Sequence, residues 1–448
     1  MIAAGAAAVE VAEVRAATPP DIVVVVLDDM RDSDWVALPE TRAWVDANGT
    51  WFPNAAMNTP QCVPARAILL TGRYAHSSGV VGNHGSEGGY EQFRRLGLEA
   101  ETFAPLARAA GYRTALVGKY LNHYSTASGV PVGWDHWLAG GNPDYRNFNL
   151  NEDGRGKHYP NSRYLTAVLR DNAARFIRSV PDDQPFLLYL GLKPAHKPAS
   201  PEQGDSGTHR NAVARKNDAF NEADVSDKPR AVRRKKPLSA KDVRRLDKME
   251  RARLDVLVSA DRTISAVRQA LAASGRLERA CVLVLSDNGY QMGEHRLVPK
   301  ALPYNGSVRF SMAAVGPGFA AGATDRRMTG LVDVAATLAD IGGFAMPTAE
   351  GRSLVAASPR TAILAEHHGM GWRSVRTPDE VYTEWDNGER EYYDLAADPD
   401  ELANGLADWE GHTPTAHATT RAAVLRPILA ALADCRGDAC RDADRMPV

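Results

Sequence analysis

A cysteine, a proline and an arginine at close spacing have the clearest potential for chemistry in this chain. They lie in the segment Gln-Cys-Val-Pro-Ala-Arg at positions 61–66. Pro64 fixes its own backbone angle and favours an extended residue before it, which predicts a turn that leads into a helix. A cysteine at a helix start, one turn before Arg66, would have a lowered pKa and a reactive sulfur in a place that favours an anion. The alternative is a buried structural cysteine in a turn, at Cys62.

Polar residues follow two long apolar runs of the sequence. Residues 21–27 read Asp-Ile-Val-Val-Val-Val-Leu and residues 281–286 read Cys-Val-Leu-Val-Leu-Ser. Both runs are typical of strands that are buried on both faces of a parallel sheet. Ligands of open α/β sheets bind at the carboxyl ends of such strands, so the residues that follow the two runs are expected to meet. These residues are Asp28, Asp29, Asp287 and Asn288.

The three acids and the amide form a set of hard oxygen ligands. Such a set suits Ca²⁺ or Mg²⁺ and does not suit zinc. The adjacent carboxylates of Asp28 and Asp29 repel each other unless a cation compensates their charge. The sequence therefore predicts a divalent cation site, with Ca²⁺ as the first expectation and Mg²⁺ as the second. A solvated turn is the alternative for Asp28 and Asp29, because aspartate is common in turns.

The spacing Cys-x-Pro-x-Arg, followed by Leu-Thr-Gly-Arg at 70–73, resembles the signature of type I sulfatases of the alkaline-phosphatase-like superfamily. In that family a maturation enzyme oxidises the cysteine to formylglycine, and the hydrated aldehyde is the nucleophile. A geminal diol attacks with one hydroxyl and then expels sulfate by collapsing to the carbonyl, which a thiol or a single hydroxyl cannot do. The resemblance implies that Cys62 is the precursor of the nucleophile and that the substrate is a sulfate ester.

Further motifs resemble the same family and occur in the family's order. Ser-Asp-Asn-Gly-Tyr at 286–290 resembles its second metal motif, which implies that Asp28, Asp29, Asp287 and Asn288 hold the cation. The resemblance also implies that Arg66 and Lys119 stabilise the diol and the sulfate, and that Lys300 binds the sulfate. His196, in Pro-Ala-His, would protonate the leaving oxygen, a role that suits histidine near neutral pH. Without the family context, Lys119 reads as a surface lysine and His196 as part of a proline-rich loop.

A narrower resemblance concerns the sulfatases that act on 6-sulfated glucosamine. Gly-Lys-Tyr-Leu-Asn-x-Tyr at 118–124 is similar to that subgroup, and it carries Leu121 where many other sulfatases have histidine. A sulfated carbohydrate of the glycosaminoglycan type is therefore the expected substrate. The candidate substrate-binding residues are His76, Asn83, Asn122, His123 and His295. His123 occupies a place where the subgroup carries an acid, and the stretch around His76 and Asn83 reads equally well as an ordinary polar loop.

Two other functions stay open at this point. A phosphate or phosphonate ester hydrolase would use the same scaffold and the same metal site. A non-catalytic glycan-binding protein would keep Cys62 as an unmodified thiol, since a fold does not by itself imply an activity.

Several predicted elements must position these residues. Buried strands are expected at 21–27, 114–117, 185–191 and 281–286, and helices at 103–110, 244–271 and 419–433. Segments 372–376 and 381–384 are typical of antiparallel strands. Together with the resemblance, this pattern predicts an α/β fold with a mixed, mostly parallel central sheet flanked by helices, and a smaller C-terminal antiparallel sheet plus helix.

The expected domain organisation has three parts. Residues 1–20 form an N-terminal extension, residues 21–350 a catalytic α/β domain, and residues 351–448 a C-terminal α+β subdomain. Residues 204–236 are polar and end in Arg-Arg-Lys-Lys, which favours a flexible, solvated insertion. A patch for a polyanion is the alternative for that segment.

Composition limits the partners and the location. The 448 residues have a net charge of -2, which argues against a generic nucleic-acid binder, and no apolar run reaches transmembrane length. Residues 1–20 lack a basic n-region, although Arg-Ala-Ala before Thr18 could be the remnant of a signal peptide. Cys435 and Cys440 either form a small disulfide, which would suit export, or are two free thiols. We expect a secreted or cell-envelope protein, with a cytoplasmic location still open.

Overall fold

Branched apolar side chains build the central strand of the molecule. The computed structural model describes residues 19–448, so the predicted N-terminal extension lies almost entirely outside the described residues. Strand β1 (Asp21–Asp28) is buried at every position. It pairs in parallel with β7 (Phe186–Ala195) on one side and with β8 (Ala280–Ser286) on the other. Neighbours on both edges and helices on both faces explain why its apolar run does not alternate with polar residues.

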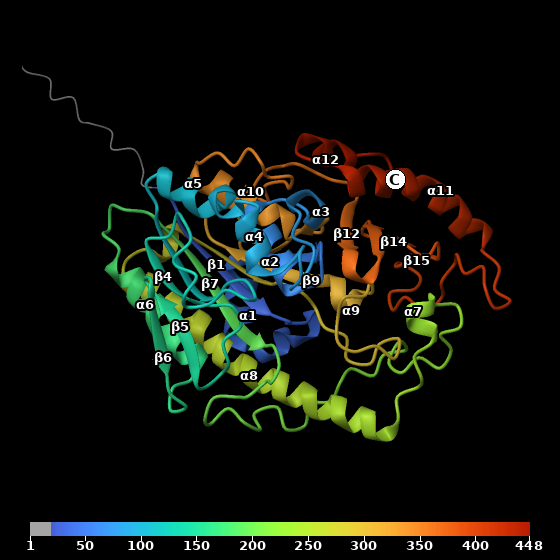
Figure 1. Cartoon of the computed structure of the whole chain (residues 1–448), viewed down its shortest axis with the longest axis horizontal. Coiled ribbons are helices and arrows are strands. Elements are labelled where there is room, and N and C mark those ends of the chain that lie inside the picture. The colour runs from blue at the N-terminus through green and yellow to red at the C-terminus, as the bar shows by residue number, and fades with distance from the viewer. Residues whose placement is uncertain (1–18) are drawn as a thin grey trace, which may run out of the picture.

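The main sheet has 11 strands in the order β10-β2-β9-β8-β1-β7-β3-β4-β5-β6, with β11 paired to β2. Figure 1 labels β1, β4, β5, β6, β7 and β9 of this sheet. Neighbours from β8 to β4 are parallel, whereas β9, β5 and β6 add antiparallel pairs. The prediction of a mixed, mostly parallel sheet is therefore confirmed. The strands not yet described are β2 (Gly49–Ala56), β3 (Arg113–Lys119), β4 (His136–Gly140), β5 (Phe148–Glu152), β6 (Arg155–Tyr159), β9 (Arg309–Val315), β10 (Ala323–Thr324) and β11 (Thr329–Gly330).

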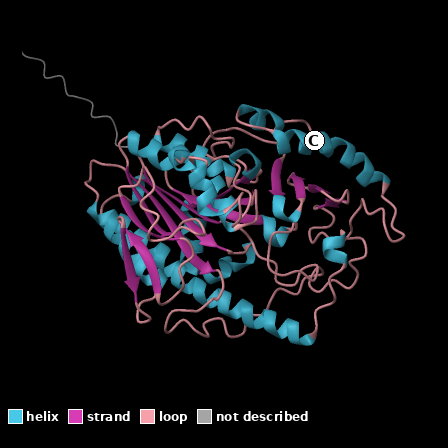
Figure 2. Ribbon diagram, viewed as in Figure 1, coloured by secondary structure: helices cyan, strands magenta, loops and turns pink. Residues whose placement is uncertain are grey.

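Helices cover both faces of this sheet (Figure 2). On one face α6 (Leu165–Ser179) and α8 (Ala240–Ala273) pack against β7 and against each other. On the other face lie α2 (Cys62–Thr71), α5 (Phe103–Ala109) and α10 (Val332–Gly342). The helix predicted at 244–271 is longer than expected because Ser239 and Asp242 form a capping box before it. The shorter helices that precede the second sheet in the chain are α1 (Pro39–Asn48), α3 (Ala75–Ser78), α4 (Gly89–Arg95), α7 (Arg230–Arg233) and α9 (Asn305–Val308).

A second, smaller sheet forms the C-terminal part, as predicted. Its strands β12 (Ile363–His367), β13 (Trp372–Arg376), β14 (Glu380–Trp385) and β15 (Arg390–Asp394) are antiparallel and lie in sequence order. Helix α11 (Ala416–Asp434) packs on this sheet, and α12 (Asp438–Ala443) follows it. Cys435 and Cys440 are joined by a disulfide, so the disulfide alternative is the one present. Within residues 19–448, no helix has the length and apolar character of a membrane span.

The segment 204–236 differs from its prediction as a solvated insertion. Ala214, Ala219, Val225 and Val232 are each at most 3% exposed, and the prediction was wrong for these positions. Ala214 belongs to a small apolar cluster that includes residues of α8 and of the loop after β8. Small apolar residues scattered through a polar sequence give no periodic signal, so their burial could not be read from the segment itself.

Strands β3 and β7 approach each other closely just before the site. Gly118 has a φ of 116°, and a Cβ atom on it would lie 2.0 Å from the Gly191 carbonyl oxygen. A Cβ on Gly191 would lie 2.4 Å from the Lys119 carbonyl oxygen. Only glycine avoids these collisions, and the close approach directs Lys119 to the carboxyl end of β1.

Candidate active site

The polar residues after β1 and β8 meet as the sequence predicted. Register pairs Leu27 with Ser286, so the two strands end side by side. The Asp29 backbone N–H donates to Asp287 Oδ1 at 3.2 Å, and Asn288 Nδ2 donates to Asp29 Oδ1 at 2.7 Å. Asp28, Asp287 and Asn288 are fully buried and Asp29 is 2% exposed. Four oxygen-bearing side chains are thus held together at the carboxyl end of the sheet.

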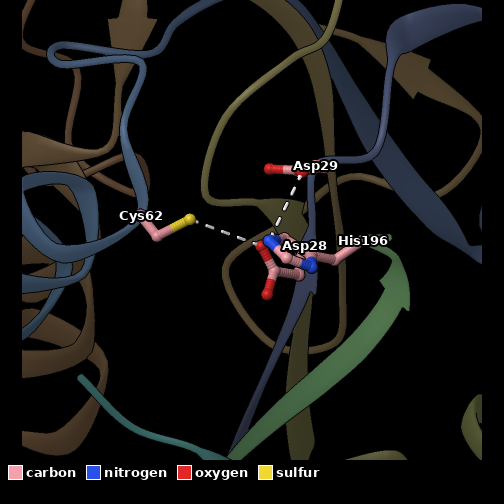
Figure 3. Close-up of side chains that lie close together, drawn as sticks. All are labelled: Asp28, Asp29, Cys62 and His196. Atoms are coloured by element: carbon pink, nitrogen blue, oxygen red, sulfur yellow. Dashed lines mark hydrogen bonds and ion pairs between the residues drawn. The ribbon is translucent and has the colours of Figure 1, made fainter. Parts of the chain in front are cut away.

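Cys62 faces these carboxylates from the first position of α2 (Figure 3). Its Sγ lies 3.6 Å from Asp28 Oδ1 and 3.2 Å from Lys300 Nζ. The side-chain oxygen of Asn83 accepts the Val63 backbone N–H at 2.8 Å. This bond occupies one of the free N–H groups at the helix start, so Asn83 fixes the orientation of the segment that presents Cys62.

Three cations surround the same point. Arg66 Nε donates to Asp287 Oδ2 at 2.8 Å, and its Nη1 donates to the Lys119 carbonyl at 2.9 Å. Lys119 forms an ion pair with Asp28, and Lys300 forms one with Asp29. The Nη2 of Arg66 is buried and has no hydrogen-bond partner among the described residues. A buried N–H group of this kind is suited to an oxygen of a bound anion.

These charges determine the ionisation of the acids. Burial by itself would raise the pKa of Asp28, but Lys119, His196 and Arg66 outweigh it and hold that pKa well below the usual range. For Asp287, burial and the neighbouring charge of Asp28 prevail and raise the pKa to about 6. Burial is the larger cause of the second shift, and the charge of Asp28 adds to it.

The prediction of a lowered pKa for Cys62 was wrong. Burial raises the pKa of this thiol to about 11, although Lys119 and Lys300 act in the opposite direction. The sequence indicated the nearby cations and the helix start correctly, but it did not show that the sulfur is only 1% exposed. A thiol with this pKa is protonated at neutral pH, so an unmodified Cys62 would be a poor nucleophile.

His196 lies on the opposite side of the carboxylates from Cys62, after β7. Its Nε2 is 3.9 Å from Asp29 Oδ2, and its Nδ1 is 2.6 Å from the Lys197 carbonyl oxygen. Burial lowers its pKa, and the positive charges of Lys119 and Lys300 act in the same direction. Lys193, three residues earlier, is 2% exposed and donates to Asn142 Oδ1 at 3.0 Å. Burial lowers the Lys193 pKa to about 8, and motif reasoning missed this lysine.

Apart from Asn83, the predicted substrate-binding residues divide into two groups. Asn122 follows Lys119 closely, and its Oδ1 is buried without a hydrogen-bond partner among the described residues. His123 is exposed and has a positive φ of 73°. These two residues have groups free for a ligand, and their role in substrate binding stays a prediction.

The ring nitrogens of His76 and His295 contact other residues of the chain. Both ring nitrogens of His76 are 2.9 Å from a partner, one being the Glu366 carboxylate and the other the Cys435 carbonyl. His295 is 1% exposed, and its Nδ1 is 2.6 Å from Glu222. These contacts join distant parts of the chain, and they lend no support to a substrate-binding role for either histidine.

The His76–Glu366 pair leads to a prediction about stability. Hydrogen bonding and charge from Glu366 outweigh burial and raise the His76 pKa, while the same pairing, together with His368, lowers the Glu366 pKa to about 2. The His76 contribution is therefore present below its unfolded pKa and is lost as pH rises through its raised folded value. The Glu366 contribution is present above its unfolded pKa and is lost as pH falls towards about 2.

Replacement of His76 by alanine is expected to lower the free energy of unfolding by on the order of 3 kcal/mol at pH 5.5, because it removes one of the two histidine partners of the buried Glu366 carboxylate. The loss should be smaller at pH 9, where the wild-type histidine is less protonated. Chemical denaturation at both pH values measures this, with exposed His84→Ala as the control. An unchanged stability accompanied by a raised KM would instead support the substrate-binding role.

Arg253 is a site residue that motif reasoning missed. This arginine of α8 is 2% exposed, and its Nη2 donates to the Asp29 carbonyl at 2.6 Å and to Asp34 Oδ2 at 2.9 Å. Its Nη1 lies 3.4 Å from the Ala195 carbonyl, next to His196. One guanidinium thereby links the segments that carry Asp29 and His196. The signal in the sequence is a charged residue on the apolar face of a predicted helix.

His367, at the end of β12, was missed as well. It is 4% exposed, and its Nδ1 accepts the Met370 backbone N–H at 3.1 Å. The neutral ring therefore carries its hydrogen on Nε2, which has no hydrogen-bond partner within residues 19–448. Burial, followed by the charges of His368 and Lys300, lowers the His367 pKa to about 4. The influence of Lys300 indicates that the C-terminal sheet reaches the neighbourhood of the site.

The donor atoms fit a hard divalent cation. One ligand atom from each of Asp28, Asp29, Cys62 and His196 lies within 4.8 Å of the others. The oxygen donors are buried and negatively charged, which is the chemistry that Ca²⁺ and Mg²⁺ require. This group contains two of the predicted ligands, Asp28 and Asp29, and the metal-binding roles of Asp287 and Asn288 stay predictions.

The fold is a mixed α/β sheet covered by helices, and its site gathers acids and cations around one cysteine at the carboxyl end of the central strands. The family model for sulfatases matches residues 20–344. The N-acetylglucosamine-6-sulfatase of Capra hircus is 28% identical over 448 aligned positions, which cover 86% of this chain and 79% of that protein. A putative extracellular sulfatase Sulf-1 homolog of Caenorhabditis elegans is 30% identical over 74% of this chain and 48% of that protein.

A solved structure of a protein in complex with its substrate D-glucosamine-2-N,6-O-disulfate has the same fold. It superposes with a TM-score of 0.75 at 21% identity and covers 95% of this chain and 99% of that one. The chain belongs to the sulfatase family, and it is a sulfuric ester hydrolase. The resemblance noted from the motifs is thereby confirmed.

Proposed function

We propose that this sulfatase hydrolyses 6-O-sulfate esters of glucosamine-type sugars, with Cys62 oxidised to formylglycine and with a divalent cation, Ca²⁺ first, at the four oxygen ligands. The observation that carries the proposal is the convergence of Cys62 with buried acids and three cations at one strand end. Similarity to the N-acetylglucosamine-6-sulfatase of Capra hircus supports the choice of sugar.

Oxidation of Cys62 to formylglycine would replace the protonated thiol, a poor nucleophile, by a hydrated aldehyde, which is a better one. The hydrated aldehyde would supply one hydroxyl that attacks sulfur and a second that lets sulfate leave as the carbonyl re-forms. Lys300, 3.2 Å from Cys62 Sγ, is positioned to hold a sulfate oxygen beside the attacking group. Lys119 and Arg66 lie on the Asp28 and Asp287 side and would stabilise the negative charge that develops there.

The cation would compensate the charge of Asp28, Asp29 and Asp287 and polarise the sulfate oxygens. His196 is held by its Nδ1 contact with the Lys197 carbonyl, which leaves Nε2 facing the site. In the imidazolium form, the ring would keep its Nδ1–H on the Lys197 carbonyl and give the Nε2 proton to the departing alcohol oxygen. Each role in this scheme is assigned to a residue that the sequence motifs had already singled out.

Paired substrates test the proposal. For the matured enzyme, kcat/KM on an aryl sulfate should exceed that on the matched aryl phosphate by at least about tenfold, which corresponds to about 1.4 kcal/mol of transition-state binding. Glucosamine 6-sulfate should be hydrolysed, and glucosamine 3-sulfate should not. Preference for the phosphate would support the phosphate or phosphonate hydrolase, and turnover of neither class would support the non-catalytic glycan-binding protein.

We also propose export to the cell envelope or the medium. The Cys435–Cys440 disulfide supports an oxidising compartment, and one similar protein is described as a putative extracellular sulfatase. Fractionation of the native host, with an antibody against the chain, measures the location. Recovery in the cytoplasmic fraction alone would contradict this proposal.

A further inference from the structure

A group of basic side chains lies outside the catalytic centre. We call it the arginine surface and define it as Arg230, Arg233, Arg234, Lys235, Lys236 and Arg296. It is built on α7 and the residues after it, on the side of the molecule that carries the C-terminal sheet and away from α6 (Figure 1). The whole chain has a net charge of -2, so this concentration of cations is a local property.

Two adjoining hollows open on the arginine surface. One of 520 Å³ is lined by Arg230, Arg233, Arg234 and Arg296, with Ser226 and Glu410 among the other residues. The second, of 480 Å³, is lined by Arg230, Arg234 and Lys235 together with Met370 and Trp385. Arg230 and Arg234 line both hollows, so the two hollows share these side chains as walls. Their volumes lie in the range of ligand sites.

Most of the charge on this surface has no acidic partner. Arg233 is neutralised by Glu389 at 2.5 Å and Glu410 at 3.1 Å, and its guanidinium lies over the Trp409 ring. By contrast, within residues 19–448 no carboxylate lies within ion-pair distance of the remaining five cations. These are Arg230, Arg234, Lys235, Lys236 and Arg296. Four of the five are exposed, and Arg296 is partly buried.

The position of these cations is held by the protein itself. Arg296 donates to the backbone carbonyls of Glu222 at 2.9 Å, Ala223 at 2.7 Å and Lys235 at 2.9 Å. These bonds attach the basic segment to the loop that continues to Lys300. The charges are therefore presented by a fixed backbone, unlike those of a solvated tail.

The arginine surface is also connected to the catalytic centre. Arg296 and Lys300 belong to the same loop after β8, and Trp372 Nε1 donates to the Ala301 carbonyl at 2.8 Å. Met370 of the second hollow donates its backbone N–H to His367, whose Nε2–H is unpartnered among the described residues. A ligand longer than one sugar could thus extend from the catalytic centre past His367 to the hollows.

We propose that the arginine surface binds further sulfate groups of a sulfated polysaccharide whose reacting sugar occupies the catalytic centre. This rests on the proposed function and adds that the substrate is a chain with several sulfates. Guanidinium groups pair with tetrahedral oxyanions through two parallel N–H bonds, and several unpaired cations in a row match a ligand with regularly repeated negative charge. Neutral sugars would not compensate this charge.

Binding of a size-defined heparin-type decasaccharide to the Cys62→Ala protein tests the proposal without any turnover. Removal of two charges in Arg230→Ser/Arg234→Ser is expected to weaken binding at low salt by about tenfold or more and to reduce the dependence of affinity on salt. The matched control is Arg175→Ser/Arg178→Ser, which removes two exposed arginines from α6, on the opposite side. Isothermal titration calorimetry at several salt concentrations measures the affinity and its salt dependence for the two double variants.

Equal binding by the two double variants would overturn the proposal. So would a single-stranded polynucleotide of equal charge that binds as tightly as the decasaccharide, since the surface would then be a general polyanion site. In the matured enzyme, the Arg230→Ser/Arg234→Ser change should leave aryl sulfate turnover unaltered and lower kcat/KM on the decasaccharide. If the decasaccharide binds through the arginine surface but the matured enzyme does not hydrolyse aryl sulfate, only the proposed function is refuted. The failure of the proposed function can thus be told apart from the failure of the arginine surface as a binding site.

Discussion

Replacement of Cys62 by alanine is expected to lower kcat on every sulfate ester by at least about 10⁴-fold, because it removes the group that becomes the nucleophile. The remaining cations and carboxylates would still bind the sulfate, so KM should change much less than kcat. The measurement is the initial rate on an aryl sulfate, with enzyme co-expressed with a formylglycine-generating maturation enzyme. Mass spectrometry of the peptide that contains residue 62 should detect the aldehyde in the wild-type protein.

Cys281→Ala is the matched control for this prediction. Cys281 is the other free cysteine of the described chain, and it is buried in β8 away from the strand end. Its replacement should leave kcat within a few-fold of the wild type. Full activity of the Cys62→Ala protein, or activity of a wild-type preparation whose Cys62 is an unmodified thiol, would contradict the formylglycine mechanism.

Removal of the divalent cation is expected to lower activity by at least about 100-fold and to destabilise the fold, because Asp28, Asp29 and Asp287 would repel one another without it. Calcium at 100 times its dissociation constant contributes about 2.7 kcal/mol to the free energy of unfolding. The protein is dialysed against a chelator, and its thermal unfolding is followed with and without added Ca²⁺ or Mg²⁺. This measures the contribution of the cation to stability independently of catalysis. Activity should return with the ion that restores stability.

Asp29→Asn should weaken Ca²⁺ binding by at least about 100-fold, since Asp29 faces both Asn288 and the Lys300 ammonium and offers a charged oxygen to the ion. The control is Asp183→Asn, an exposed acid next to β7. The prediction is contradicted if the chelated protein has the same melting temperature and the same activity as the untreated one. The four oxygen-bearing side chains would then hold no cation, and the ion pairs with lysine would be enough to compensate the charge of the acids.

The convergence of the acids could be predicted from the sequence because it depends on local patterns. A branched apolar run commits a segment to a buried strand, and parallel strands in one sheet end at the same edge. Asp28 and Asp287 are each fixed by their distance from such a run, and Arg66 is fixed one helical turn after Cys62. Local spacing was therefore enough to assemble most of the candidate site.

Properties that depend on burial could not be predicted in the same way. The Cys62 pKa was expected to fall because of neighbouring charges, yet it rises because the sulfur is removed from water. The segment 204–236 was expected to be solvated because of its charge, yet Val225 and Val232 are buried. Solvent exposure is a property of the whole chain, since it depends on which distant surfaces cover a residue.

The amino-acid sequence by itself determined the class of the fold, the family motifs with their order, and the meeting of the acids that follow the two buried strands. Only the tertiary structure showed that the Asn83 side chain accepts a bond from the start of α2, that Arg253 links the segments of Asp29 and His196, and that His76 contacts Glu366. It also decided that the basic residues 230–236 attach through Arg296 to the loop of Lys300. The physical reason is the distance along the sequence over which each effect acts. Strand, helix and turn preferences act over a few neighbouring residues, whereas these contacts join segments that are far apart in the sequence.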